Sequence, residues 1–206
     1  MKRIGFLLLI LSLLQGCMKD SPKPAPDPPK ENPKAESAAP PVFDGKRAYG
    51  YLLSQTNFGP RVPGSEAHRN CLDYLSAELG QYADAVNLQP FTVTGYDNEP
   101  VRMSNVIASF NARATTRILL LAHWDSRPWA DQERDPVEAA KPILGANDGA
   151  SGVAVLLEIA RHLKASPPAV GVDILLTDGE DYAKEGNEED YLRGARYFAE
   201  IGRAHV

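Results

Sequence analysis

The sequence predicts an α/β sandwich in which helices cover a largely parallel sheet. Two continuous apolar runs, residues 117–122 and 170–176, are typical of strands that are buried on both faces. Between them, residues 149–164 place apolar side chains at helical spacing, which is typical of a helix that packs one face against a sheet. Strands that alternate with helices in this way favour a parallel sheet with helices on its faces.

The residues before Val42 are expected to lie outside this fold. A basic start precedes a short apolar run, Ile4 to Leu14, which is typical of a signal peptide and too short to span a bilayer. Cys17 follows this run in the manner of a bacterial lipoprotein, so residues 1–17 are predicted to be a lipoprotein signal with Cys17 as the lipid-attachment site. An ordinary secretory signal is the alternative. Residues 18–41, rich in proline and charge, then form a disordered tether.

Lipidation of Cys17 predicts where the protein resides and what its other cysteine does. Met18 rather than aspartate follows Cys17, which in Gram-negative lipoproteins indicates the outer membrane, facing the periplasm. The membrane is then a partner through the N-terminal lipid. Cys71 has no second cysteine to pair with and lies in a helical apolar pattern, so a buried thiol is expected. The formal net charge of −5, without a Lys/Arg cluster, argues against nucleic acid as a partner.

Two helices are predicted at the start of the folded part. Asp44 can cap a helix that runs through Leu53, with apolar positions at Tyr49, Leu52 and Leu53. The proline- and glycine-rich residues 59–64 then break the pattern. Residue 64 or 65 starts a second helix, which runs to about residue 79.

The remaining elements follow in order along the chain. Strands are predicted at 91–95 and 104–110, ahead of the first buried run. The long helix at 149–164 is stopped by two prolines, and a further helix is predicted at 190–200, after the second buried run. The apolar face of the long helix consists of Val153, Leu156, Leu157, Ala160 and Leu163.

Polar side chains follow both buried runs and precede the long helix. His123 and Asp125 follow the first run, and Asp148 lies just before the helix. Glu180 and Asp181 follow the second run, and in α/β sheets ligands bind beyond such strand ends. Each residue alone has an ordinary explanation, namely a packed histidine, a helix cap or a solvated strand end. Together they favour a divalent metal site, best suited to zinc, because so many carboxylates at one edge need a cation.

Three motifs carry these residues and resemble one known family. They are His-Trp-Asp-Ser-Arg-Pro-Trp at 123–129, Gly-Ala-Asn-Asp-Gly-Ala-Ser-Gly at 145–152 and Asp-Gly-Glu-Asp-Tyr at 178–182. They resemble the zinc-dependent exopeptidases of the M28 type and, among these, the bacterial glutaminyl-peptide cyclotransferases (glutaminyl cyclases). The resemblance covers residues 42–200. It implies a three-layer α/β sandwich around a mixed, largely parallel sheet, the phosphorylase/hydrolase-like zinc exopeptidase fold, incomplete at the C-terminus.

The resemblance implies a role for each matching residue. Asp148 and Asp181 would be zinc ligands, and Glu180 would be the general acid and base. In the family the residue at Asp181 is often glutamate, so the shorter side chain departs from the pattern. His123 and Asp125 would bind and orient a second zinc in an aminopeptidase, or line the site of a cyclase that holds one zinc. The substrate pocket would be walled by Trp124, Trp129 and Tyr182, for which core packing is the alternative.

The implied activity is cyclisation of N-terminal glutaminyl peptides to pyroglutamyl peptides with release of ammonia. Peptide or protein N-termini are then the substrates. An M28-type zinc aminopeptidase that hydrolyses N-terminal residues is the first alternative. A non-catalytic envelope lipoprotein is the second, against which the intact Glu180 beside Asp181 argues.

The resemblance also implies a histidine ligand well beyond Asp181. His205 is too close to Asp181 in sequence, and its surroundings do not match. Residues 201–206 correspond to the translation of a common sequencing adapter, so a non-native tail is expected there. With an incomplete zinc shell, the chain as written is expected to be inactive.

Overall fold

The computed structural model describes residues 41–184 and 186–203. The predicted signal peptide, Cys17, nearly all of the tether and residues 204–206 lie outside these ranges, so what was predicted for them remains a prediction. Within the described ranges, no helix is both long enough and apolar enough to cross a membrane.

The described strands form one mixed sheet with the order β1-β2-β4-β3. β1 (Ala85–Thr94) and β2 (Pro100–Phe110) form an antiparallel hairpin, and β2 is also antiparallel to β4 (Gly171–Thr177). β3 (Arg117–His123) is parallel to β4. The α/β class and the mixed sheet are confirmed. Among the described strands, β3 and β4 are the parallel pair. β1 and β2 are antiparallel because the short turn between them leaves no room for a crossover.

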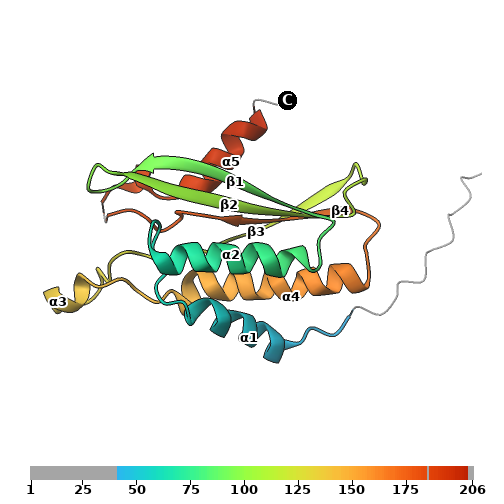
Figure 1. Ribbon diagram of the computed structural model, residues 1–206, viewed down its shortest axis with the longest axis horizontal. Coiled ribbons are helices and arrows are strands. Elements are labelled where there is room, and N and C mark those ends of the chain that lie inside the picture. Colours follow the sequence, from blue (N-terminus) through green and yellow to red (C-terminus); the bar gives the residue numbers. More distant parts are fainter. Residues whose placement is uncertain (1–40, 185, 204–206) are drawn as a thin grey trace, which may run out of the picture. The chain divides into compact units, whose positions relative to one another are not determined.

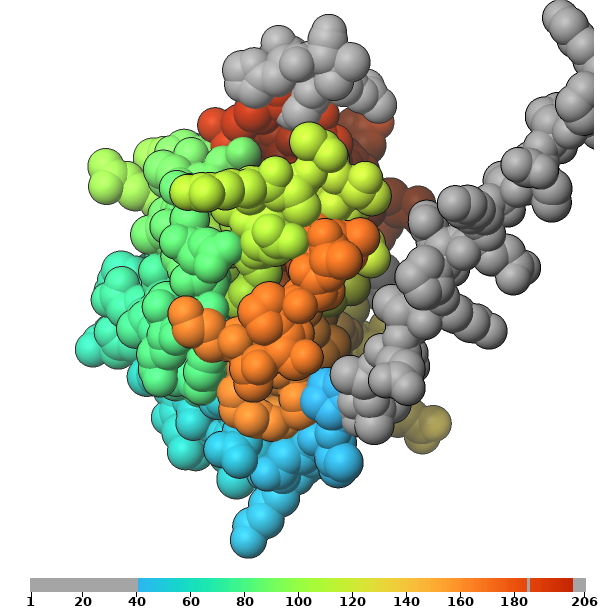
Figure 2. Space-filling view, turned by 90° about the vertical axis from the view of Figure 1, so that its right-hand side faces the viewer, coloured from blue at the N-terminus to red at the C-terminus, as the bar shows by residue number. Residues whose placement is uncertain are grey.

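Helices lie on both faces of this sheet (Figure 1). α2 (Glu66–Gly80) and α4 (Ser151–Ala165) pack against one face, and α1 (Gly45–Thr56) packs on α4 from outside. α5 (Arg193–Arg203) lies on the opposite face, against β2 and β4. Figure 2 shows the same order from the side, with α1 in blue and α5 in red. The connections contain three short elements, α3 (Pro136–Ala139), η1 (Ala146–Ala150) and η2 (Glu188–Asp190).

The first two helices begin at the predicted residues. The Asp44 carboxylate accepts a hydrogen bond from the Arg47 backbone N–H, and Ser65 caps α2 in the same way. The predicted apolar face of α1 is right only for Leu52, which packs against the core, whereas Tyr49 and Leu53 are exposed. The buried residues of α1 are Ala48, Tyr51 and Gln55, one turn apart on the side that faces α4.

One apolar core fills the space between the sheet and the α2–α4 layer. The predicted face of α4 is confirmed, since Val153, Leu156, Leu157 and Ala160 are buried in this core and Leu163 packs against it. Cys71 is a fully buried free thiol on α2, as expected.

β3 and β4 differ in burial although both are apolar runs. Every residue of β4 except Asp173 is buried, which confirms the prediction for this strand. On β3, Ile118, Leu119 and Leu121 are 50%, 47% and 53% exposed. The prediction of burial on both faces is therefore wrong for β3 within the described residues, because β3 is the edge strand there and α5 packs on β2 and β4 instead.

Candidate active site

The site begins where the parallel strands β3 and β4 end side by side. His123 at the end of β3 pairs in register with Thr177 at the end of β4. The Trp124 backbone N–H then donates to the Thr177 carbonyl oxygen over 3.0 Å. The segments that follow the two strands, with Asp125 on one and Glu180 on the other, therefore start from the same edge of the sheet.

Asp125 joins these two segments. Its side chain is fully buried, and its two carboxylate oxygens accept hydrogen bonds from the backbone N–H groups of Glu180 at 3.0 Å and Asp181 at 3.1 Å. The same carboxylate lies 3.3 Å from His123 Nδ1. Asp125 thus fixes the turn that displays Glu180 and Asp181 and orients the His123 ring. The sequence predicted a metal-binding or site-lining role for Asp125 and did not reveal these contacts to the neighbouring segment.

Asp148 lies on a non-helical turn rather than at a helix cap. Asp148 has φ −90° and ψ 110° and Gly149 has φ 90°, so α4 starts only at Ser151. A Cβ on Gly149 would lie 2.7 Å from the Asp125 carbonyl oxygen and 3.2 Å from the His123 ring. Because glycine allows this close approach, the Asp148 carboxylate comes within 2.8 Å of His123 Nε2.

Negative charge dominates this cluster and shifts its pKa values. Burial alone would lower the pKa of His123, but hydrogen bonds and charges from Asp125, Glu180 and Asp148 outweigh it and raise that pKa to about 9. Burial, together with the neighbouring carboxylates, raises the pKa of Glu180. Burial also raises the pKa of Asp181 to about 6, against the opposing charge of Arg127. Such crowding of carboxylates makes the site favourable for a cation.

Arg127 is a site residue that the sequence did not single out. Its Nε lies 3.2 Å from Asp181 Oδ1, and its Nη1 lies 3.2 Å from Asp131. Nη2 contacts the Tyr191 hydroxyl group. The guanidinium therefore neutralises one of the two predicted zinc ligands. Its position two residues after Asp125, within the first motif, was the only available signal.

His68 and Asp178 form a second buried pair that the sequence did not predict. His68 Nε2 lies 2.9 Å and 3.0 Å from the two oxygens of Asp178, which also accepts from the Ser104 backbone N–H at 2.6 Å. Burial raises the pKa of Asp178, and the bond to His68 opposes that rise. Because Asp178 lies two residues before Glu180, this pair supports the segment that carries Glu180 and Asp181.

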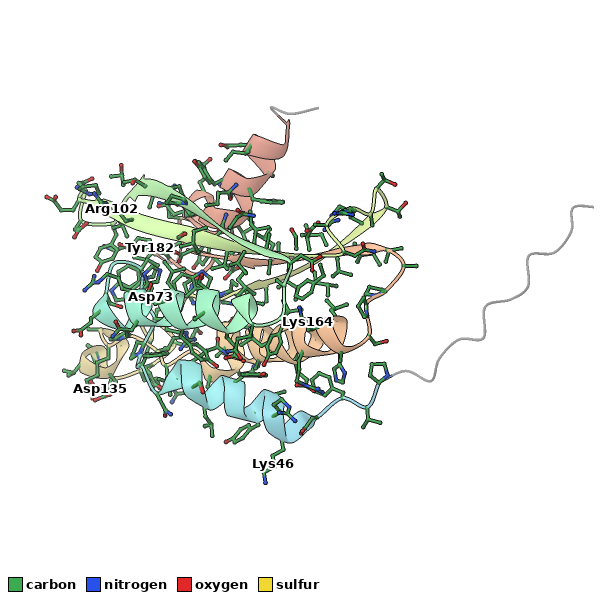
Figure 3. All side chains as sticks on the ribbon, turned by 45° about the vertical axis from the view of Figure 1, so that its right-hand side comes forward. Lys46, Asp73, Arg102, Asp135, Lys164 and Tyr182 are labelled. Atoms are coloured by element: carbon green, nitrogen blue, oxygen red, sulfur yellow. The ribbon has the colours of Figure 1, made fainter. Side chains whose placement is uncertain are left out.

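The three aromatic residues of the predicted pocket lie in different surroundings. Trp124 is fully buried and its ring stacks on His68, with ring centroids 4.3 Å apart. Tyr182 lines a hollow at the hairpin end of the sheet, near Arg102 (Figure 3). Trp129 packs edge-on against Tyr96, with ring centroids 4.6 Å apart.

A cavity of about 470 Å³ opens beside Glu180. Its other lining residues are Glu188, Glu189, Tyr191, Leu192 and Arg196. The Glu180 carboxylate lies 3.9 Å from His123 Nδ1, and no hydrogen bond to it is found among the described residues. Glu180 thus lines this cavity, and its carboxylate is not held by a hydrogen bond from another described residue.

The donor types of the site fit zinc, although the described residues do not close a shell around it. One imidazole and the carboxylates of Asp148 and Asp181 are ordinary zinc ligands. Within the described ranges, no three His, Cys, Asp or Glu side chains converge closely enough to hold a metal ion. Asp148 and Asp181 are engaged by His123 and Arg127 respectively.

An α/β sandwich that gathers an imidazole and several carboxylates at its parallel strand ends has the architecture of the zinc-dependent exopeptidase class. Residues 105–205 match the model of Peptidase family M28, and the chain belongs to this family.

Solved structures agree with this assignment in fold. The glutaminyl cyclase of Tannerella forsythia is 43% identical, with a TM-score of 0.74 over 77% of this chain and 56% of that one. A Zn-dependent exopeptidase from Parabacteroides distasonis is 40% identical, with a TM-score of 0.75 over 78% and 57%. Among curated relatives, the glutaminyl-peptide cyclotransferase-like protein of Mus musculus is 30% identical over 77% of this chain and 42% of that protein. The chain thus spans about two fifths to three fifths of the relatives that it matches.

Proposed function

We propose that the protein is a zinc-dependent glutaminyl cyclase, which converts N-terminal glutaminyl peptides into pyroglutamyl peptides and releases ammonia. The observation that carries this proposal is the placement of Glu180. Its backbone is held by the buried Asp125, and its carboxylate lies 3.9 Å from Nδ1 of His123, whose other ring nitrogen contacts Asp148. Glu180 also lines a cavity. The 43% identity to the Tannerella forsythia glutaminyl cyclase supports this proposal.

Asp148 and Asp181 are the residues that would hold one zinc in a cyclase, with His123 and Asp125 beside it. When bound, zinc supplies Lewis-acid polarisation of the side-chain carbonyl of the substrate glutamine. The Asp181 carboxylate is paired with Arg127, so Asp181 would bind zinc once Arg127 releases that carboxylate.

Glu180 performs the proton transfers. Its carboxylate takes a proton from the α-amine of the substrate as the amine nitrogen bonds to the side-chain carbonyl carbon. It then gives a proton to the leaving nitrogen as the carbon–nitrogen bond of the side-chain amide breaks and ammonia departs. The raised pKa of Glu180 favours a carboxylate that holds the proton before giving it to the leaving nitrogen.

An aminopeptidase is the second candidate, supported by the 40% identity to the Parabacteroides distasonis exopeptidase. In that reaction Glu180 activates a water molecule for attack on the first peptide bond, and two zinc ions are expected. A non-catalytic lipoprotein would bind peptide N-termini without converting them.

One assay separates these activities in the full-length protein. Incubation with a glutaminyl peptide should release ammonia without loss of a residue, whereas a freed N-terminal amino acid would indicate the peptidase. Glu180→Gln should lower turnover about 100-fold to 10,000-fold. The exposed Glu133→Gln is the matched control and should retain full turnover. Unchanged turnover in Glu180→Gln would refute the acid/base assignment.

We also propose that Cys17 carries lipid and anchors the protein in the bacterial envelope, at the outer membrane. Radiolabelled palmitate should label the wild-type protein and leave Cys17→Ser unlabelled. Cys17→Ser should also move from the membrane fraction to the soluble fraction of the periplasm. Equal labelling of both proteins would exclude Cys17 as the attachment site.

A further inference from the structure

Arg61 is a fully buried arginine that binds backbone rather than a carboxylate. Its Nε donates to the Trp124 carbonyl oxygen at 3.0 Å. Its Nη1 and Nη2 donate to the carbonyl oxygens of Leu144 at 2.8 Å and Gly145 at 2.7 Å. Burial lowers the pKa of Arg61, which reflects the cost of keeping a cation there. Arg61 has no ion-pair partner among the described residues. The groups to which it donates should therefore explain why a buried cation is kept there.

The three carbonyl groups belong to the two segments that carry the candidate site. Trp124 lies between His123 and Asp125, while Leu144 and Gly145 open the turn that bears Asp148. The Arg61 carbonyl oxygen in turn accepts from the Ser126 backbone N–H at 3.2 Å. One residue therefore bonds to both segments at four points.

The contact between these segments is also tight in packing. Gly145 has a left-handed backbone with φ 60°. A Cβ added there would lie 2.8 Å from the Ser126 Cβ atom and 3.0 Å from Arg61 Nη2. The turn can approach Arg61 only because residue 145 has no side chain.

The far end of the same turn is held by a second buried side chain. Gln55 on α1 is fully buried, and its Nε2 donates to the Ala150 carbonyl oxygen at 3.1 Å. The Ala150 backbone N–H closes the turn onto the Gly145 carbonyl oxygen at 3.2 Å. With both ends fixed, the position of Asp148 follows from the position of Arg61.

We propose that Arg61 is a positioning residue, which holds the turn bearing Asp148 against the His123–Asp125 segment and so sets the His123–Asp148 contact. The inference rests on the proposed function only in treating these two residues as part of the metal site. It also gives a role to the Gly-Pro-Arg-Val-Pro-Gly stretch at 59–64, which the chemistry of the site did not otherwise use. Arginine suits this role because its planar fork reaches three carbonyl groups at once, and a lysine ammonium cannot reproduce that geometry.

The test compares Arg61→Lys with Arg117→Lys in the full chain. Arg117 is a matched control because it also donates to backbone carbonyl groups, those of Asn111 and Ala114, but at the opposite end of β3. Two quantities are measured besides the midpoint of thermal unfolding. The first is the NMR signal of the His123 ring in metal-free protein, and the second is binding of cobalt(II), followed by its visible absorption.

Arg61→Lys should shift the His123 signal and weaken cobalt(II) binding at least tenfold. Arg117→Lys should leave the His123 signal in place and the cobalt(II) affinity within twofold of wild type. This should hold even if its midpoint of thermal unfolding falls as far as that of Arg61→Lys. Gly145→Ala, which pushes a methyl group into the same contact, should reproduce the Arg61→Lys result and serves in its place if that variant does not fold.

An unshifted His123 signal in Arg61→Lys or Gly145→Ala would overturn the proposal. Equal effects in the Arg61 and Arg117 variants would overturn it too, because they would show a general loss of stability. The NMR measurement does not depend on catalysis. If the wild-type protein neither cyclises glutaminyl peptides nor binds cobalt(II), the proposed function fails while the His123 signal still decides the role of Arg61.

Discussion

Charged side chains lie at both ends of the β3–β4 strand pair, namely the starting end, at Arg117 and Gly171, and the finishing end, at His123 and Thr177. Opposite charges are paired at the starting end, whereas carboxylates crowd together at the finishing end. At the starting end, Arg117 Nε and Nη2 donate to the two oxygens of Asp173 at 2.6 Å and 2.7 Å, and this bond lowers the pKa of Asp173. At the finishing end, the pKa values of Glu180 and Asp181 are raised, first by burial. His123 and Arg127 oppose the negative charge there.

The starting end therefore holds a structural ion pair, whereas the finishing end has the charge of a ligand-binding site. The Arg117–Asp173 pair is complete within the chain and needs nothing more. The carboxylates at the finishing end are held by Asp125 and the Asp148 turn in an arrangement that His123 and Arg127 neutralise only in part. Substitutions at the finishing end should therefore affect function most, and substitutions at the starting end should affect stability alone.

The largest effect is expected for Asp125→Asn. An amide nitrogen in place of one carboxylate oxygen would face the backbone N–H of Glu180 or Asp181, leaving a buried donor without an acceptor. The resulting displacement of Glu180 should lower kcat/KM at least 100-fold, as expected when a catalytic group moves by about 1 Å. Steady-state kinetics of the full-length protein with a glutaminyl peptide measure this. Asp173→Asn is the matched control at the starting end, and an equal loss in that variant would contradict the comparison.

A smaller effect is expected when zinc is added. A cation that binds only the folded protein stabilises it by about 2.7 kcal/mol at a free concentration 100 times its Kd. Urea unfolding of the full-length protein with and without zinc should show this gain. Asp148→Asn should reduce it, whereas Arg117→Met should keep it. A gain that survives in Asp148→Asn would place zinc elsewhere.

The starting end should respond to Arg117→Met with a loss of stability alone. Arg117 and Asp173 are 27% and 23% exposed, so the loss should lie between that of a surface pair and that of a buried one. Urea denaturation measures it, and kcat/KM should stay at the wild-type value. A fall in kcat/KM at constant KM would show that the two ends are coupled.

The sequence predicted what local rules determine. Asp44 and Ser65 cap helices because a short polar side chain at those positions can reach a backbone N–H three residues on. The apolar spacing of the α4 segment likewise predicted the face that is buried. The motif residues were correctly expected at one edge of the sheet, since parallel strands end together.

What the sequence did not predict depends on contacts between distant segments. Tyr49 and Leu53 were wrongly expected on the buried face of α1 because α4 decides which side of α1 is buried, and that packing involves residues about a hundred positions apart. β3 was expected to be buried because an apolar run looks the same at the edge of a sheet as in the middle. The contacts of Asp125 and Arg61 with backbone groups leave no pattern along the chain, since backbone donors and acceptors occur at every residue.

The smallest effect concerns the pH dependence of stability at the starting end. The pKa of Asp173 is lowered below its ordinary value of 3.8 in the folded protein, chiefly by the hydrogen bond from Arg117. The unfolded chain therefore binds more protons than the folded one in this range, and Asp173 stabilises the fold fully only above about pH 5. As the pH falls through the folded pKa, that contribution is lost.

Asp173→Asn has no such group, so the difference in unfolding free energy between wild type and Asp173→Asn should be constant from about pH 5 to 7 and shrink below about pH 4. Urea unfolding of both proteins at several pH values tests this, and a difference that persists unchanged to about pH 2 would mean that packing of Asp173, rather than its charge, stabilises this end.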